Sequence, residues 1–273
     1  MQVPSKLAGW ENGRASAEGL SFSAPGGPQL SGYLVRPSFS AASGAGRHGV
    51  VLVHGFPEPG HETGSPSYGY PQLATRLAAE TGSMVLTFDL RGTGESAGDF
   101  SLTGWQADLA SATGALREIP GVEKIWLVGF AAGATLAICA AGDDTALAGV
   151  AAFAPPAEFA ERASDPRKLL AEARSMGVIH ARDFPEDPSA WARELREIEP
   201  LRLVAQIPPR PLLIVHGAND DVVPMTAARE LADAANSTAE LRILPAAGHM
   251  LLHDPRAIAL LLGWFDRHLG GAG

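Results

Sequence analysis

The sequence predicts an α/β protein with a mostly parallel central sheet and helices on both faces. From His48 onward, short apolar runs alternate with stretches of helical periodicity, which is the pattern of parallel strands joined by crossover helices. Before that point, the segments 19–23 and 30–36 flank a turn-rich stretch at 24–28. This arrangement predicts an antiparallel pair of strands at the start of the sheet.

The alternating part of the chain supplies the remaining elements. Strands are expected at Val50–Val53, Met84–Phe88, Ile125–Val128, Val150–Phe153, Leu212–Val215 and Leu241–Leu244. Helices are expected at 71–80, 104–119, 132–141, 226–235 and 255–269. Gly82 is a suitable C-cap for the first of these helices, and Asp254 followed by Pro255 is a suitable start for the last one.

The stretch 155–208 breaks this alternation. It contains no clear strand-like run, and it holds two helix-like pieces that open at Asp165 and Asp187, each followed by proline. We therefore expect a core formed by residues 1–154 and 209–273, with 155–208 as a helical cap inserted over the C-terminal edge of the sheet. A long crossover connection is the alternative interpretation of this stretch.

Composition excludes several classes of partner. The 273 residues are 46% apolar and 19% charged, with a net charge of -9, which argues against nucleic acid and anionic membranes as partners. Cys139 is the only cysteine, and the N-terminal residues do not have the pattern of a signal peptide. We expect a cytoplasmic protein that acts on a small molecule without a cofactor. The sequence predicts no oligomeric state.

Five segments with chemical potential follow predicted strands, where reactive groups of open α/β sheets collect. His-Gly-Phe-Pro at 54–57 follows the first parallel strand, and Asp-Leu-Arg-Gly-Thr-Gly-Glu-Ser at 89–96 follows the next. Gly-Phe-Ala-Ala-Gly at 129–133 opens a helix. His-Gly-Ala-Asn-Asp-Asp-Val-Val-Pro at 216–224 and Gly-His at 248–249 follow the last two strands. No Gly-Lys-Ser/Thr accompanies the glycines of the second segment, so a phosphate-binding P-loop is discounted.

Taken in order, these segments resemble the α/β-hydrolase family, and the resemblance covers essentially the whole chain. Bacterial serine aminopeptidase-like and dienelactone-hydrolase-like members are the most similar. The resemblance implies that Ala131 stands at the nucleophile position, that Asp220 is the acid and that His249 is the base. It also implies that the backbone N–H groups of Phe56 and Ala132 form the oxyanion hole. Segment 89–96 is a structural loop in that family.

Ala131 departs from the family pattern, in which a serine occupies this position. The flanking Gly129 and Gly133 fit a sharp strand-to-helix turn, because backbones approach closely there. The central residue of such a turn carries backbone strain of about 1–3 kcal/mol. In this chain the strained residue presents a methyl group, which cannot attack a carbonyl.

Several other residues carry side chains that are capable of catalysis or binding. Cys139, Ser111 and Asp89 have the wrong sequence context to replace the serine. No metal site is expected, because His249 and His253 fall in a loop with no third ligand marked nearby. For substrate binding, the candidates are His54, Phe130 and Trp191, of which the aromatic residues suit an apolar acyl pocket and are also common in protein cores.

Three interpretations of Ala131 remain open. In the first, the chain is a carboxylic ester hydrolase of the Ser-His-Asp type that carries an engineered serine-to-alanine substitution. In the second, the alanine is natural, and the chain is a pseudo-hydrolase that binds a ligand or partner without catalysis. In the third, which we rank last, His249 activates water directly. Losing the nucleophile of a serine hydrolase costs about 10⁶ in kcat, so the chain as written is expected to be nearly inactive.

Overall fold

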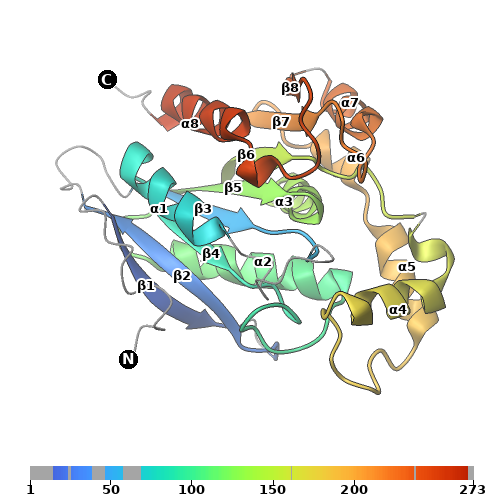
Figure 1. Cartoon of the computed structure of the whole chain (residues 1–273). Coiled ribbons are helices and arrows are strands. Elements are labelled where there is room, and N and C mark those ends of the chain that lie inside the picture. Colours follow the sequence, from blue (N-terminus) through green and yellow to red (C-terminus); the bar gives the residue numbers. More distant parts are fainter. Residues whose placement is uncertain are drawn as a thin grey trace.

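The computed structural model describes residues 15–23, 26–38, 47–57, 69–160, 162–236 and 238–269. Its strands form one eight-stranded sheet with the order β1-β2-β4-β3-β5-β6-β7-β8 (Figure 1). The strands are β1 (Ala15–Phe22), β2 (Leu30–Pro37), β3 (His48–Val53), β4 (Met84–Phe88), β5 (Lys124–Phe130), β6 (Leu147–Phe153), β7 (Leu212–Gly217) and β8 (Glu240–Leu244).

The strand pairing confirms the predicted mostly parallel sheet. β1 pairs with β2 and β2 pairs with β4 in antiparallel fashion, and every pair from β4 to β8 is parallel. β1 begins at Ala15, four residues before the expected start, because its polar N-terminal half is paired along β2 as far as Pro37. The predicted turn at 24–28 lies partly outside the described residues.

All the predicted helices are present in the structure. They are α1 (Tyr70–Thr81), α2 (Leu102–Arg117), α3 (Ala132–Asp143), α4 (Pro166–Ser175), α5 (Pro188–Glu197), α7 (Met225–Ala234) and α8 (Pro255–Leu269). Gly82 ends α1 in the left-handed conformation, as a C-cap does. The side chains of Asp165 and Asp187 cap α4 and α5 through backbone N–H groups of the first turn. No described helix has the length and apolar character needed to cross a membrane.

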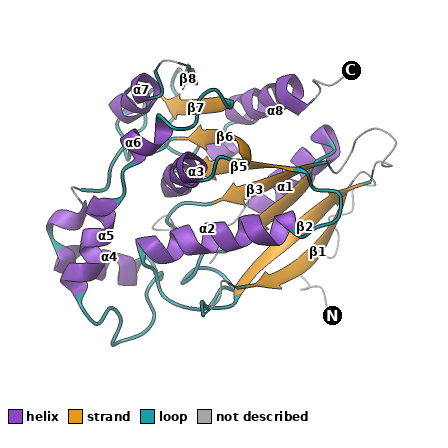
Figure 2. Ribbon diagram, turned by 180° about the vertical axis from the view of Figure 1, so that it is seen from behind, coloured by secondary structure: helices purple, strands orange, loops and turns teal. Residues whose placement is uncertain are grey.

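Alternate residues of the central strands face opposite layers of helices. In β3, Val51 and Val53 pack in one apolar cluster with α2, α3 and α7, whereas Val50 and Leu52 pack in a second cluster with α1 and α8. Figure 2 shows α2 and α3 in front of the sheet, with α1 and α8 behind it. Both faces of the sheet are therefore covered, which explains why its strands are continuous apolar runs.

Between β6 and β7 the described residues form helices and no strand. In addition to α4 and α5, this stretch holds two short elements that the sequence did not predict, η2 (Arg162–Ser164) and α6 (Pro200–Val204). α6 packs against α3 and α7, whereas α5 contacts α2 at the edge where the strands end (Figure 1). Only α4 and α5 therefore have the position expected of a cap, and a cap that spans all of 155–208 stays a prediction.

Candidate active site

Ala131 sits at a sharp turn between β5 and α3. Its φ of 50° and ψ of -125° are unusual for an alanine, and they make it the N-cap of α3. Its N–H donates a hydrogen bond of 2.8 Å to Phe153 O on the neighbouring strand β6. The structure therefore holds this residue in the strained conformation of a nucleophile elbow, although no nucleophile is present.

Three glycines make this turn possible. A Cβ on Gly129 would lie 2.3 Å from Gly133 O, and a Cβ on Gly133 would lie 2.3 Å from His54 O. A Cβ on Gly55 would lie 2.9 Å from the Cβ of Ala131 and 3.2 Å from Ala132 N. The turn that follows β3 is thus packed against the elbow, at the place where the family resemblance puts the oxyanion hole.

Asp220 and His249, the predicted acid and base, are hydrogen-bonded to each other beyond the ends of the two neighbouring strands β7 and β8. His249 Nδ1 lies 2.8 Å from Asp220 Oδ2. The other carboxylate oxygen, Oδ1, accepts the N–H groups of Val222 and Val223 at 2.9 and 2.8 Å. The side chain of Asp220 is fully buried, whereas that of His249 is 12% exposed. The neighbouring Asp221, the other carboxylate of this segment, is exposed to solvent.

The environment keeps Asp220 ionised. Burial raises the pKa of Asp220, but the hydrogen bonds from His249, Val223 and Val222 outweigh it, so that the pKa of this carboxyl is lower than usual. An ionised Asp220 accepts a hydrogen bond from the Nδ1–H of His249, which leaves Nε2 of that ring as its second functional atom. The pair therefore has the hydrogen-bond pattern of a general base and its orienting acid.

The segments that follow β5, β7 and β8 all lie within a match to a known protein family. The sequence matches the alpha/beta hydrolase family over residues 50–259, which is more than half of the chain. The chain belongs to the alpha/beta hydrolase family. This membership agrees with the observed sheet order and with the elbow at Ala131.

Individual relatives of this α/β hydrolase are distant. The protein YfhR of Salmonella typhimurium is 25% identical over 238 residues, which are 86% of this chain and 75% of that protein. Among solved structures, the Pyrococcus furiosus esterase Pf2001 superposes with a TM-score of 0.67 at 18% identity and covers 99% of this chain and 97% of its own. Est1E from Butyrivibrio proteoclasticus superposes with a TM-score of 0.66 at 18% identity, covering 91% and 96%. At identities this low, these superpositions establish a shared fold and nothing more.

In this α/β hydrolase the loop after β4 is structural. Arg91 and Asp108 form a buried ion pair of 2.7 Å, and the N–H of Arg91 also bonds Asp108. Gly92 is required because a Cβ there would lie 2.2 Å from Val178 O. The carboxylate of Asp89 accepts the N–H of Glu95 at 3.0 Å, which keeps it within its own loop. Segment 89–96 follows β4, is bonded to Asp108 of α2, and packs against Val178 in the loop between α4 and α5.

The three candidates for substrate contact are buried, and their role in substrate binding stays a prediction. His54 is 1% exposed, with Nδ1 2.6 Å from Gly55 O and Nε2 accepting the N–H of Leu90 at 3.0 Å. Phe130 stacks on Phe153 at 4.7 Å in the layer of α1 and α8. Trp191 is 3% exposed and donates its Nε1–H to Phe100 O at 2.9 Å.

Alternative reactive groups are occupied elsewhere. Ser111 Oγ donates to Ala107 O within α2, and Cys139 is buried in α3, where burial raises its pKa to about 12. His253 is exposed, as expected. In the part of the chain that the structure describes, no group of three or more His, Cys, Asp or Glu side chains is arranged to hold a metal ion.

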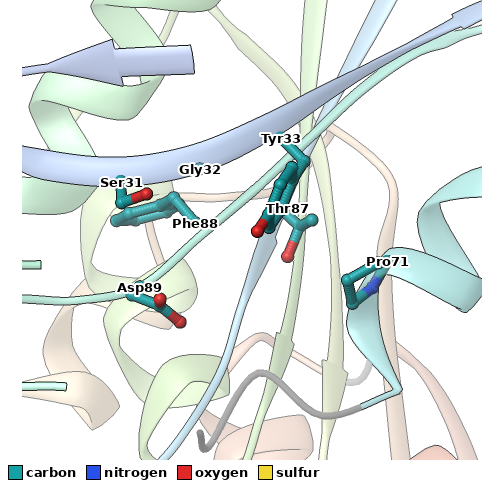
Figure 3. A pocket seen from close by; sticks show the side chains of 7 residues that line it. All are labelled: Ser31, Gly32, Tyr33, Pro71, Thr87, Phe88 and Asp89. Carbon is teal, nitrogen blue, oxygen red and sulfur yellow. The ribbon is translucent and has the colours of Figure 1, made fainter. Parts of the chain in front are cut away.

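A small hollow lined by a different set of residues lies between β2, β4 and the start of α1 (Figure 3). Tyr33 and Thr87 extend side by side into it, and Asp89 lies at its lower end. Its cavity volume is about 10 Å³, far below the roughly 300 Å³ at which ligand pockets begin. None of its lining residues is Ala131, Asp220 or His249, so we assign no substrate to it.

Sequence reasoning did not include one residue of this site, His216. Its Nε2 lies 3.3 Å from Asp220 Oδ2, and its side chain is fully buried. The signal was present, because His216 opens the segment 216–224 that identified the acid. Gly217 belongs to the same arrangement, since a Cβ there would lie 2.4 Å from Ala247 O in the loop that leads to His249.

Proposed function

We propose that the site is that of a carboxylic ester hydrolase of the Ser-His-Asp type in which the nucleophile is missing. The observation that carries this proposal is the hydrogen bond of 2.8 Å between His249 Nδ1 and Asp220 Oδ2, in a chain whose elbow keeps its strained conformation at Ala131. Acid, base and elbow geometry are all in place. One hydroxyl group separates this arrangement from a working serine hydrolase.

With serine at position 131, each residue has a definite step. The serine Oγ adds to the ester carbonyl while its proton moves to His249 Nε2, and the negative charge on the carbonyl oxygen is held by the N–H groups of Phe56 and Ala132. The alkoxide then leaves with the proton from His249. Water adds to the acyl-enzyme in the same manner, and it releases the carboxylic acid and the serine. Asp220 holds the imidazole and stabilises its charged form.

The test is the substitution Ala131→Ser. We expect this variant to hydrolyse p-nitrophenyl acetate at least about 10³-fold faster than the parent chain, because loss of a serine nucleophile costs about 10⁶ in kcat. Release of p-nitrophenol measures the rate. If the folded variant hydrolyses the ester no faster than the parent, the proposal fails.

Matched controls separate the acid from its neighbour. In the Ala131→Ser background, Asp220→Asn should lower kcat on the order of 10³–10⁴-fold, because the carboxylate no longer selects the tautomer of His249. Asp221→Asn makes the same chemical change one residue away on an exposed side chain, and it should leave kcat within about 2-fold. Equal effects of the two substitutions would contradict the assignment of Asp220.

A second function, ligand binding without turnover, is favoured by Ala131 itself. The methyl group leaves the elbow and the partly exposed His249 in place while it removes the attacking atom. A ligand that binds only the folded chain raises its stability, by about 2.7 kcal/mol at a ligand concentration of 100 Kd. Esters and carboxylic acids screened by thermal shift should then raise the Tm by several degrees.

The control for binding is Ala131→Leu, which fills the space in front of the elbow. This variant should lose the shift in Tm that the parent shows with the same compound. A shift of equal size in both proteins would place the ligand elsewhere. An absence of any shift across the screen would leave hydrolysis by the serine variant as the function of the site.

A further inference from the structure

His216 is the next-to-last residue of strand β7 and lies beside the buried carboxylate of Asp220. Its side chain is fully buried, with Nε2 3.0 Å from Val223 O and 3.3 Å from Asp220 Oδ2. Its other ring nitrogen, Nδ1, is also buried and has no hydrogen-bond partner among the described residues. A buried polar nitrogen without a partner is uncommon in folded proteins, so this arrangement calls for a physical reason.

The surroundings fix the tautomer of His216. A carbonyl oxygen only accepts, so the Nε2 that faces Val223 O must carry the hydrogen. A hydrogen on Nδ1 would be a buried donor with no acceptor, which is costly, so Nδ1 is the unprotonated nitrogen of a neutral ring. His216 therefore donates its Nε2–H to Val223 O, and the same nitrogen lies 3.3 Å from Asp220 Oδ2.

The ring of His216 lies against the acid and donates to the loop that carries it. Oδ1 of Asp220 accepts the N–H groups of Val222 and Val223, and Oδ2 faces Nδ1 of His249 and Nε2 of His216. Because Val223 donates to the carboxylate and accepts from His216, the loop after β7 is closed back onto the end of its own strand. Both carboxylate oxygens are thereby held in one orientation.

His54 shows what a buried histidine with a packing role looks like in the same sheet. It directly follows β3, and both of its ring nitrogens are paired with backbone groups, Nδ1 with Gly55 O and Nε2 with Leu90 N. His216 differs, because it leaves one nitrogen without a partner and places the other beside a carboxylate. Packing alone does not account for that choice.

We infer that His216 is a positioning residue: it fixes the rotamer of Asp220 and, through Asp220, the Nδ1–H tautomer of His249. The catalytic consequence rests on the proposed function, because this tautomer leaves Nε2 of His249 to receive the proton of a nucleophile. The structural consequence does not depend on it, because the tautomers are properties of the chain as it stands.

The first measurement uses the unaltered chain with ¹⁵N-labelled histidine. Two-bond correlations between ring protons and nitrogens distinguish the tautomers without observation of an exchangeable proton. At neutral pH we expect His216 in the Nε2–H form and His249 in the Nδ1–H form. An imidazolium or an Nδ1–H form at His216 would overturn the inference, and this arm needs no variant other than those used for assignment.

The second measurement compares two substitutions of the same residue. His216→Phe keeps an aromatic ring but removes the N–H, and it should shift the nitrogen signals of His249 towards a mixture of tautomers. His216→Gln keeps an N–H donor and should restore the signals of the parent. His48→Gln is the matched control, since His48 accepts a bond of 3.1 Å from Trp126 at the other end of the sheet. An unchanged tautomer of His249 in His216→Phe would overturn the inference.

The third measurement is of kcat and KM, because a purely structural role of His216 would not produce a loss of kcat that His216→Gln recovers. In the Ala131→Ser background, His216→Phe should lower kcat on the order of 10-fold or more with KM little changed, and His216→Gln should recover most of the loss. Equal kcat in all three proteins would overturn the catalytic part. If Ala131→Ser is itself inactive, the proposed function fails, and the ¹⁵N measurement still decides the role of His216.

Discussion

At the scale of single residues, Ala131 stands in a backbone conformation that suits glycine better than alanine. Its φ is 50°, and such a conformation costs a residue with a Cβ about 1–3 kcal/mol. Glycine would be free of this strain but would lose more entropy on folding, about 0.4–1 kcal/mol. An alanine kept at this position therefore lowers the stability of the fold.

The substitution Ala131→Gly should therefore raise the free energy of unfolding by about 1 kcal/mol. Ala140→Gly is the control, because Ala140 lies partly exposed in the regular part of α3, where glycine costs about 1 kcal/mol. Urea denaturation of the two variants measures both changes. If both substitutions destabilise the chain equally, the strain at Ala131 is not real.

Asp220 should make stability depend on pH. Its pKa in the folded chain is lower than the unfolded value of about 3.9, so its ionised form stabilises the fold above about pH 4, and this contribution is lost as the pH falls through the folded value. The free energy of unfolding should thus exceed that of Asp220→Asn most clearly near pH 5. Urea titrations at lower pH should show the gap narrowing, and a gap that widens instead would contradict the assignment.

The close approach of Asp220 and His249 was predictable from sequence because their motifs fix both residue type and strand end. Asp220 and His249 each follow a strand, and neighbouring parallel strands bring them together. The proposed substrate contacts were not predictable in this way. Whether Phe130 or Trp191 faces a pocket depends on which layer of helices covers it, and both side chains are covered.

At the scale of elements, Arg210 connects the end of α3 to the strands that follow. Its Nη1 donates to Asp144 O and Leu147 O at 3.0 and 3.1 Å, and its Nη2 donates to Ala141 O at 2.7 Å. The last carbonyls of a helix have no partner within the helix and carry its negative dipole end. A single guanidinium thus caps α3, the helix that begins at Ala131.

Arg210→Met should lower the free energy of unfolding by about 2 kcal/mol, because charged donors to buried carbonyls are strong and the carbonyls would be left without them. Arg76→Met is the control, because Arg76 forms an exposed i,i+4 pair with Glu80 and should matter by less than about 0.5 kcal/mol. Guanidinium denaturation monitored by circular dichroism measures both. Similar losses in the two variants would show that Arg210 does not cap α3.

Strands and long helices followed from the sequence because their apolar periods are set locally. The ends of elements differ from the predicted ends where pairing with another strand sets them. One example is Ala15, which is paired with Pro37. α6 was missed because five residues from Pro200 to Val204 are too few to show a helical period. Its position depends on packing against α3 and α7.

At the scale of the whole molecule, the α4–α5 unit shares the apolar cluster of the sheet. Leu169, Trp191 and Leu195 belong to the same cluster as Val51 of β3 and residues of α2 and α3. Thr103 at the start of α2 also donates both its N–H and its hydroxyl to Glu194 of α5. The sequence indicated an insertion, but it could not show that the insertion lacks a core of its own.

The chain should therefore unfold in one cooperative transition. Hydrogen exchange measured by mass spectrometry in rising urea should show peptides of α4 and α5 opening together with those of β5. Earlier opening of α4 and α5, with the sheet still protected, would contradict a shared core and would favour a separate cap domain.

We propose that Ala131 is the one missing member of a serine-hydrolase site. The most direct measurement is reaction of the Ala131→Ser variant with a fluorophosphonate, in which the serine oxygen displaces fluoride and forms a bond to phosphorus. Mass spectrometry should find one phosphonate on residue 131 of this variant, none on the parent chain, and slow labelling when His249→Gln is added. A folded Ala131→Ser variant that remains unlabelled would contradict the claim.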